Sequence, residues 1–323
     1  MSDMDYVFAV ARIRVKEKYL LSDADVSQMV SMKDDRSVLG FLEDRGWGDS
    51  ASSGNADAVL QKEEEKTREV LRECAGNSDI FEILSLPELY HNLKAGIKEV
   101  CTSETNGRAF YPVPKYGRED MLRILTEKKF DALPEHMRAV AARALEVMLQ
   151  TRDGQRCDIL VDRACLDAMA AAGARSKDPF IRDYENSQVA VTDIKIAVRG
   201  ERTGKSREFL REALAPVEGL DVRRMAQAAS EGRDSLLLFL SEHGYSEAAE
   251  AIKESPSAFE RWCDNHLMKT IRPQKRNLAS VGPVVAYYLA RENEIRTARI
   301  ILTAKANGFS EDATRERVRE MYV

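Results

Sequence analysis

The sequence contains few of the residues that form disulfides and metal sites. Among 323 residues there are five cysteines and four histidines, and no two cysteines form a CxxC pair. An odd number of scattered thiols argues against a disulfide framework, and this spacing does not suit a zinc site. We therefore expect buried, reduced cysteines and no metal or other cofactor.

Long uncharged runs are absent as well. The longest, residues 277–290, is shorter than the roughly 20 apolar residues that a helix needs to cross a bilayer. The first residues, MSDMDYVFAVAR, carry acids where a signal peptide would be basic. We expect no membrane span, and contact with a membrane only through partners.

An excess of positive charge is also missing. Charged residues make up 32% of the chain, yet the net charge is −5, which argues against a nucleic-acid partner. Alternating β-branched runs are nearly absent, whereas Ala, Leu, Glu, Arg and Lys, which favour helices, are plentiful. The sequence therefore predicts an all-α protein.

Catalytic signatures are not found. Arg199 to Ser206, RGERTGKS, resembles a phosphate-binding loop, but Arg199 occupies the position of the first required glycine. We interpret this segment as the end of a helix followed by a basic loop. The four histidines have no partners at motif spacing, and no GxSxG or HExxH pattern occurs. We expect no active site.

The most informative segment of the chain is Pro283 to Gly308, PVVAYYLARENEIRTARIILTAKANG. Proline suits the first turn of a helix and Asn-Gly is a typical helix end, so one long helix is predicted. Its apolar residues follow the three-and-four spacing of a buried face. A belt of charge interrupts this face, formed by Arg291, Glu292, Glu294, Arg296 and Arg299. Both a solvated face and a buried role are compatible with the belt.

Further helices are expected throughout the chain. The first is predicted over residues 5–20, and the helices that follow it have N-caps at Ser22 or Asp23 and at Asp34 or Asp35. The run QKEEEK, residues 61–66, is interpreted as a solvated helix face.

An internal repeat relates three of the predicted helices. Triplets of a polar acceptor, an aliphatic residue and a cation recur at intervals of 101 residues, and each helix ends near a glycine, at 107, 204 and 308. The triplets are Asn92-Leu93-Lys94, Asp193-Ile194-Lys195 and Glu294-Ile295-Arg296. Residues 38–49 also resemble residues 236–247, at nearly twice this period.

The period predicts three similar helical domains, at residues 1–107, 108–208 and 209–323. Three equivalent units would close most naturally around a pseudo-threefold axis, although an open array is an alternative. Residues two apart lie on nearly opposite sides of a helix, so the acceptor and the cation of one triplet cannot pair. We hypothesise that the triplets, with Glu292 and Arg299, bridge to neighbouring helices and lock the domains together.

The last fifty residues resemble the C-terminal signature of the C-subunit family of V-type (A/V-type) ATPases and ATP synthases, which is related to the eukaryotic d subunit. The segment 6–22, YVFAVARIRVKEKYLLS, is similar to the start of the family's sequences, and YHNLKAGIK and TDIKIAVRG are similar to two internal parts. The C-terminal resemblance is carried by Gly282-Pro283, Tyr287-Tyr288, the E-x-E-I pattern at 292–295, and the Lys-x-x-Gly ending at 305–308.

The resemblance implies a non-catalytic, all-helical, funnel-shaped rotor part of three similar domains. Such a part lies on the proteolipid ring at the cytoplasmic face of the membrane and receives the foot of the central shaft. It couples ATP turnover to proton or sodium transport. The expected partners are therefore central-shaft subunits and the proteolipid ring.

A basic patch near the C-terminus is a candidate partner surface. Its cations would face acidic rotor surfaces or lipid head groups, and a solvated loop is the alternative. The patch consists of Lys269, Arg272, Lys275 and Arg276. An unrelated helical-repeat adaptor is the second function considered, although its repeats would be shorter, commonly about 34 to 47 residues.

Overall fold

The structure is a computed structural model and describes residues 3–75, 80–102, 110–278 and 280–323. Regular structure in these ranges is helical, apart from an isolated β-bridge between Val217 and Leu220. The predicted all-α class is confirmed. No helix in these ranges has the length and apolar composition needed to span a membrane.

The chain forms two compact units. Unit 1 combines Met1–Ile80 with Gly244–Val323, and unit 2 is Phe81–His243. The division into three similar domains stays a prediction, and its first boundary falls in 103–109, outside the described residues.

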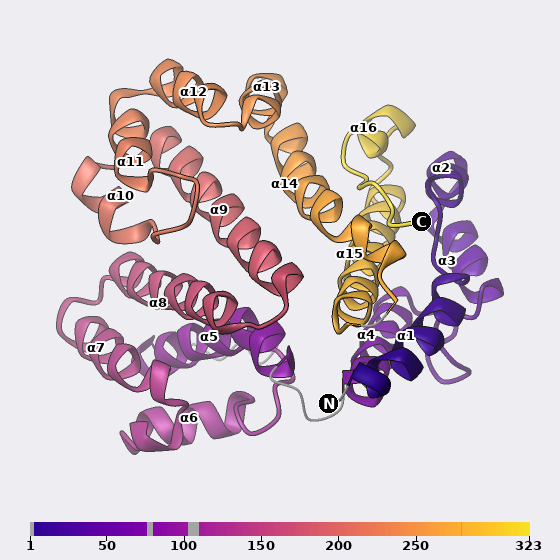
Figure 1. Ribbon diagram of the computed structural model, residues 1–323, viewed down its shortest axis with the longest axis horizontal. Helices are drawn as coiled ribbons and strands as arrows, with labels where there is room; N and C mark the ends of the chain where they lie inside the picture. Colours follow the sequence, from indigo (N-terminus) through magenta and orange to yellow (C-terminus); the bar gives the residue numbers. More distant parts are fainter. Residues whose placement is uncertain (1–2, 76–79, 103–109, 279) are drawn as a thin grey trace. The chain divides into compact units, whose positions relative to one another are not determined.

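Unit 1 is built from both ends of the chain, which Figure 1 draws in indigo and yellow-orange. Its helices are α1 (Asp3–Glu17), α2 (Asp23–Ser31), α3 (Asp35–Asp44), α4 (Ala56–Ala75), α13 (Ser246–Glu254), α14 (Pro256–Ile271), the 3-10 helix η3 (Arg272–Arg276), α15 (Gly282–Ala306) and α16 (Glu311–Arg315).

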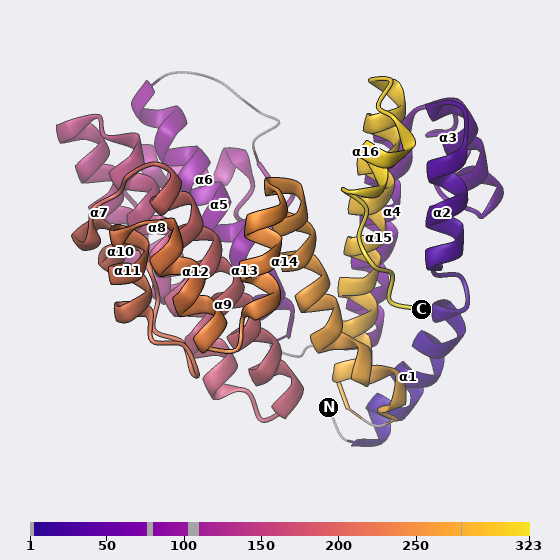
Figure 2. The ribbon, with the colours of Figure 1, turned by 90° about the horizontal axis from the view of Figure 1, so that it is seen from above.

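The predicted long helix is confirmed as α15, and it is the centre of unit 1. It packs against α1, α2, α3, α4, α14 and α16, and the long α4 lies beside it (Figures 1 and 2). Gly308 follows the helix with a φ of 68°, the left-handed conformation expected at this end. Most side chains of α15 are buried, because helices cover it on several sides.

The predicted N-caps of unit 1 are present. The Ser22 side chain accepts from the Asp25 N–H, and the Asp25 side chain accepts in return from the Ser22 N–H. Asp34 caps α3 by accepting from the Ser37 N–H. These caps satisfy N–H groups that a helix start leaves without partners, so the sequence defines where α2 and α3 begin.

Unit 2 contains the middle of the chain. Its helices are α5 (Ile80–Thr102), α6 (Arg118–Thr126), the 3-10 helix η2 (Phe130–Ala132), α7 (Glu135–Thr151), α8 (Gly154–Arg175), α9 (Pro179–Arg202), α10 (Arg207–Ala213), α11 (Val222–Glu231) and α12 (Arg233–Glu242).

The core of unit 2 forms where α5, α6, α7 and α8 meet, and it includes Leu93, Met121, Leu145 and Val161. Helix α8 packs against both α7 and α9 (Figure 1). Gly96 permits a close approach of α5 to α6, since a Cβ there would lie 2.8 Å from Met121 and Leu125 side-chain atoms. Two of the three triplet helices, α5 and α9, belong to unit 2.

Candidate functional site

The acceptor of the first triplet ties α5 to the segment that precedes α6. Asn92 is fully buried, and its Oδ1 accepts from the Tyr111 N–H at 2.8 Å. Its Nδ2 donates to the carbonyl oxygens of Tyr111 and Tyr116, both at 2.9 Å. One side chain thus satisfies three backbone groups of this irregular segment, which would be costly to bury unpaired.

The acceptor of the second triplet has the same role on α9. Asp193 is fully buried, and its Oδ1 accepts from the N–H of Ala215 at 3.0 Å, just after α10. Its Oδ2 has no hydrogen-bond partner among the residues that the structure describes. Burial raises the pKa of Asp193 to about 8, although the bond from Ala215 opposes the rise. Around neutral pH this side chain is therefore mainly a protonated acid.

A neighbouring carboxyl on α9 is buried in a similar way. Glu185 is 2% exposed, and within the described part of the chain its Oε2 has no hydrogen-bond partner. Burial raises the pKa of Glu185 to about 8. Unit 2 therefore holds two carboxyl groups that are stable inside only when they are neutral.

The acceptor of the third triplet belongs to a buried network of charges in unit 1. Glu294 on α15 accepts from the N–H of Leu21, which lies between α1 and α2, and from the guanidinium of Arg291. Arg291 also pairs with Glu63 on α4 and lies over the Trp47 ring, with 4.8 Å between Cζ and the ring centroid. All three charged side chains are at most 8% exposed. Burial raises the pKa of Glu294, and the Arg291 charge and the Leu21 N–H oppose the rise.

The same network extends to the surface through Glu63. Its Oε1 accepts from the Gly48 N–H at 2.9 Å and from the Lys66 ammonium at 2.7 Å. Lys66 in turn donates to the Gly48 carbonyl at 2.6 Å. The interpretation of 61–66 as only a solvated face was wrong, because Glu63 points into unit 1 where α15 supplies its cation. A run of acids and lysines gives no indication of which member a distant arginine will bury.

The cations of the triplets lie nearer the surface than the acceptors. Lys94 pairs with Asp162 on α8 at 2.6 Å, and Arg296 pairs with Asp264 on α14 at 2.7 Å. Arg299 pairs with Glu64 on α4 at 2.9 Å. Lys195 and Glu292 are half-buried on their helices. Each of the three pairs joins two different helices, and the role of these positions as locks between domains stays a prediction.

The three acceptors share one geometry. Each is buried in the middle of a long helix, and each accepts a hydrogen bond from the backbone N–H of a segment outside that helix. A further signal of the repeat is the small buried residue four positions on, namely Gly96, Ala197 and Ala298. The triplet pattern did not include this small residue, although its 101-residue spacing can be read from the sequence.

The basic patch is largely engaged within unit 1. Lys269 pairs with Glu247 at 2.8 Å, and Arg272 pairs with Glu320 at 2.8 Å and donates to the Met321 carbonyl. Lys275 lies over the Tyr322 ring, with 4.9 Å between Nζ and the ring centroid. Arg276 is exposed at the end of η3. Arg272 and Lys275 therefore hold the last segment of the chain, and the role of the patch toward partners stays a prediction.

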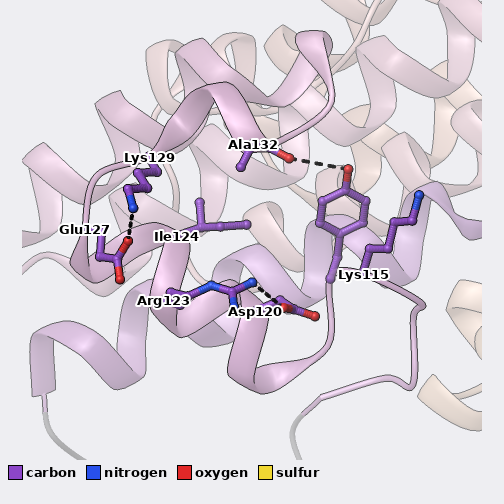
Figure 3. Close-up of a pocket in the computed structure, with 8 residues that line it drawn as sticks. Lys115, Asp120, Arg123, Ile124, Glu127, Lys129 and Ala132 are labelled. Atoms are coloured by element: carbon purple, nitrogen blue, oxygen red, sulfur yellow. Dashed lines mark hydrogen bonds and ion pairs between the residues drawn. The ribbon is translucent and has the colours of Figure 1, made fainter.

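The largest of the described cavities lies in unit 2, with a volume of about 590 Å³. Figure 3 shows its lining from α6 and the segments on either side of it. Arg123 pairs with Asp120 and Lys129 with Glu127, both at 2.6 Å, so four of its charges cancel in pairs. This lining offers no nucleophile paired with a base, which acyl or phosphoryl transfer would need.

The segment that resembles a phosphate loop ends a helix. Helix α9 continues through Gly200 to Arg202, and Gly204 follows with a φ of 62°. A Cβ on Gly200 would lie 2.4 Å from Leu210 Cδ2, so this glycine serves the packing of α9 against α10. The interpretation as a helix end is confirmed, and the backbone N–H groups of Gly200 and its neighbours are used inside the helix.

Most of the cysteines are buried inside the protein, and two of the histidines form hydrogen bonds within it. None of the five cysteines forms a disulfide, and all but Cys101 are buried. Burial raises the pKa of Cys157 to about 11, which keeps it a neutral thiol. His136 Nδ1 shares a hydrogen bond with the Tyr90 hydroxyl at 2.8 Å, and His243 Nδ1 contacts the Phe239 carbonyl at 2.7 Å.

Comparisons with known proteins cover almost the whole chain. The sequence profile of the ATP synthase (C/AC39) subunit family matches residues 9–317. The C subunit of the V-type sodium ATPase of Enterococcus hirae is 21% identical over 99% of both chains. The C subunit of the V-type ATP synthase of Thermus thermophilus is 26% identical over 97% of this chain and 98% of its own. The C subunit of the A-type ATP synthase of Methanocaldococcus jannaschii is 21% identical, over 96% of this chain and 85% of its own.

Proposed function

Because the chain belongs to the ATP synthase (C/AC39) subunit family, we propose that it is a non-catalytic central-stalk subunit of a V/A-type ATPase. In this role it is the socket that links the central shaft to the proteolipid ring of the membrane sector. It thereby couples ATP turnover to the transport of protons or sodium ions. The observation that carries the proposal is the match over residues 9–317, because it spans both units and not one shared segment.

The internal construction of the chain suits a part that transmits torque. Such a part must resist deformation more than it must position reactive groups. Buried polar side chains on α5, α9 and α15 form hydrogen bonds with irregular segments. These bonds hold each segment rigidly against its long helix. We include in the proposal three similar domains around a pseudo-threefold axis in a funnel, with the triplets as locks between them.

The proposal places the protein at the cytoplasmic face of the membrane as a peripheral part of the complex. Its partners are the central-shaft subunits and the proteolipid ring, and it needs no cofactor. The basic patch around Arg276 remains a candidate contact for either partner or for lipid head groups. The alternative of an unrelated helical-repeat adaptor has no support beside a family match of this extent.

Affinity purification from the protein's own cells tests the proposal. The chain carries a C-terminal tag, membranes are solubilised in mild detergent, and the bound proteins are quantified by mass spectrometry. We expect shaft subunits and the proteolipid in fixed ratio to the chain. Consistent absence of both from the purified material, with intact ATPase present in the same membranes, would defeat the proposal.

Coupling is measured in inverted membrane vesicles from cells that lack the chain. We expect ATP-driven ion uptake to be lost, and to return when the chain is expressed again. The matched control is the same strain expressing Gly40→Ala, since a Cβ there meets no atom within 4 Å. ATP-driven ion uptake that persists without the chain contradicts a coupling role.

A further inference from the structure

Helix α1 presents apolar side chains on two faces, and unit 1 covers only one of them. Val10 and Ile13 are buried toward the rest of unit 1, where α1 packs against α4 and α15. On the other face Phe8 is 80% exposed, Val15 is 56% exposed and Val7 is 50% exposed. Phe8 and Val15 are seven residues apart, so they form one stripe along the helix.

Positive charge borders this exposed stripe. Between Val7 and Tyr19 there are four cations and one acid, Glu17, which pairs with Arg14. Lys16 and Lys18 have no ion pair among the described residues. Arg12 pairs with Glu73 on α4, so these two lysines are the cations at the edge of the apolar stripe that the described part of the chain does not neutralise.

A cavity of about 280 Å³ lies at the C-terminal end of the stripe, within unit 1. Lys16 and Tyr19 belong to its lining, and Tyr19 is itself 73% exposed. Four cations and one carboxylate line the cavity, and that carboxylate, Glu63, is already bound by Arg291 and Lys66. The other cations of the lining include Arg45, which pairs with Asp25.

We propose that this face of α1 and the adjoining cavity form one docking surface for an acidic amphipathic helix of a partner protein. The apolar side of that helix packs on Phe8 and Val15, and a carboxylate at its end enters the cavity beside Lys16. Helices recognise one another in this way when apolar residues at three-and-four spacing are flanked by charges of opposite sign. The surface lies in unit 1 alone, so the proposal can fail while the stalk role stands.

The positive charge of this face favours an acidic helix over a second copy of the chain or a membrane. A second copy of the chain would bring Lys16 and Lys18 against the same lysines, which is unfavourable. Anionic membranes are bound by clusters of about four to eight free cations, and this face offers two. A short apolar stripe that ends at a cationic cavity fits a single helix with a terminal carboxylate better than a lipid surface.

Photo-crosslinking in living cells identifies the occupant. Phe8 of the full chain is replaced by p-benzoylphenylalanine, and the crosslinked peptide is sequenced by mass spectrometry. We expect one protein segment with apolar residues at helical spacing and flanking Glu or Asp. The same replacement at Leu238, which is 61% exposed on α12 of unit 2, is the control and should not capture that segment.

Binding of a synthetic peptide with the captured sequence is then measured on the purified full chain. We expect Val15→Asp and Lys16→Glu each to weaken binding at least about tenfold, and Leu238→Asp to leave it unchanged. Higher salt should weaken binding to the wild type more than to Lys16→Glu. In the crosslinking experiment, capture of lipid, of a second copy of the chain or of a segment without acids overturns the proposal, and so does the absence of any captured segment. In the binding experiment, unchanged peptide affinity of Val15→Asp and Lys16→Glu overturns it.

Discussion

In unit 1 the carboxylates of Glu63 and Glu294 are buried against the Arg291 guanidinium, whereas in the described part of unit 2 Glu185 and Asp193 form no ion pair and each buries one oxygen without a hydrogen-bond partner. Both solutions avoid an uncompensated buried charge, the first by pairing and the second by protonation. Asn92, at the equivalent position of α5, avoids charge altogether. At all three triplet positions the side chain accepts a hydrogen bond from a backbone N–H, whereas its charge differs from one position to the next.

Removal of Arg291 should have the largest effect, because it leaves the buried Glu294 without a cation and the buried Glu63 with Lys66 alone. We expect Arg291→Met to lower the free energy of unfolding by about 3–5 kcal/mol. Both tryptophans of the chain, Trp47 and Trp262, lie in unit 1, so urea unfolding followed by tryptophan fluorescence reports on this unit.

The matched control is Arg299→Ala, whose pair with Glu64 is half exposed and contributes at most about 1 kcal/mol. Adding Glu63→Gln and Glu294→Gln to Arg291→Met should restore much of the loss, because no charge then remains buried. A loss below about 1 kcal/mol for Arg291→Met would show that the network is not a buried ion pair in solution.

The second prediction concerns the pH dependence of unit 2. The folded-state pKa of Asp193 is raised to about 8, from about 3.9 in an unfolded chain, so its contribution is complete at low pH. Stability is then lost as pH rises from about 4 to 8, by up to about 1.4 kcal/mol per pH unit. Asp193→Asn keeps the acceptor for Ala215 and cannot ionise. We expect it to stabilise unit 2 at pH 9 and to have little effect at pH 5.

Hydrogen exchange measured by mass spectrometry on α9 and on the segment at Ala215 follows this change without a tryptophan in unit 2. Glu294→Gln is the comparison in unit 1, where it leaves Arg291 with one fewer partner and should destabilise at both pH values. Faster exchange in Asp193→Asn than in the wild type at pH 9 would show that the buried acid is ionised and favourable.

Much of this arrangement was accessible from the sequence. The 101-residue spacing located Asn92, Asp193 and Glu294, and the apolar stripe with its Pro and Gly ends located α15 to within two residues. Those features are local or periodic, so one sequence contains them. The partners were not accessible, because Glu63 and Arg291 are 228 residues apart and meet only when the two ends of the chain pack together.

The charge states of the acceptors were missed for a more local reason. Nothing in the triplets themselves distinguishes Asp193 from Glu294, since both stand before an isoleucine and a cation in a helix. The difference arises from which side chain lies three positions earlier. Arg291 occupies that position on α15, and Ala190 occupies it on α9. A pattern extended to this position indicates which acceptor has a cation.

The smallest expected effects separate the acceptors of the triplets from the cations. Lys94 and Arg296 form single pairs with partly exposed members, so we expect Lys94→Ala and Arg296→Ala each to cost at most about 1 kcal/mol. Asn92→Ala is the matched comparison on the helix that carries Lys94. It removes the buried side chain that pairs with three backbone groups of Tyr111 and Tyr116, and should cost about 1–3 kcal/mol. Urea unfolding followed by circular dichroism measures all three variants.

If the cation variants lose as much free energy of unfolding as Asn92→Ala, the contacts that the triplets make with neighbouring elements depend on charge at the helix surface. If they lose little, the repeat preserves an acceptor for a backbone N–H, which explains why Asn, Asp and Glu can all occupy its first position.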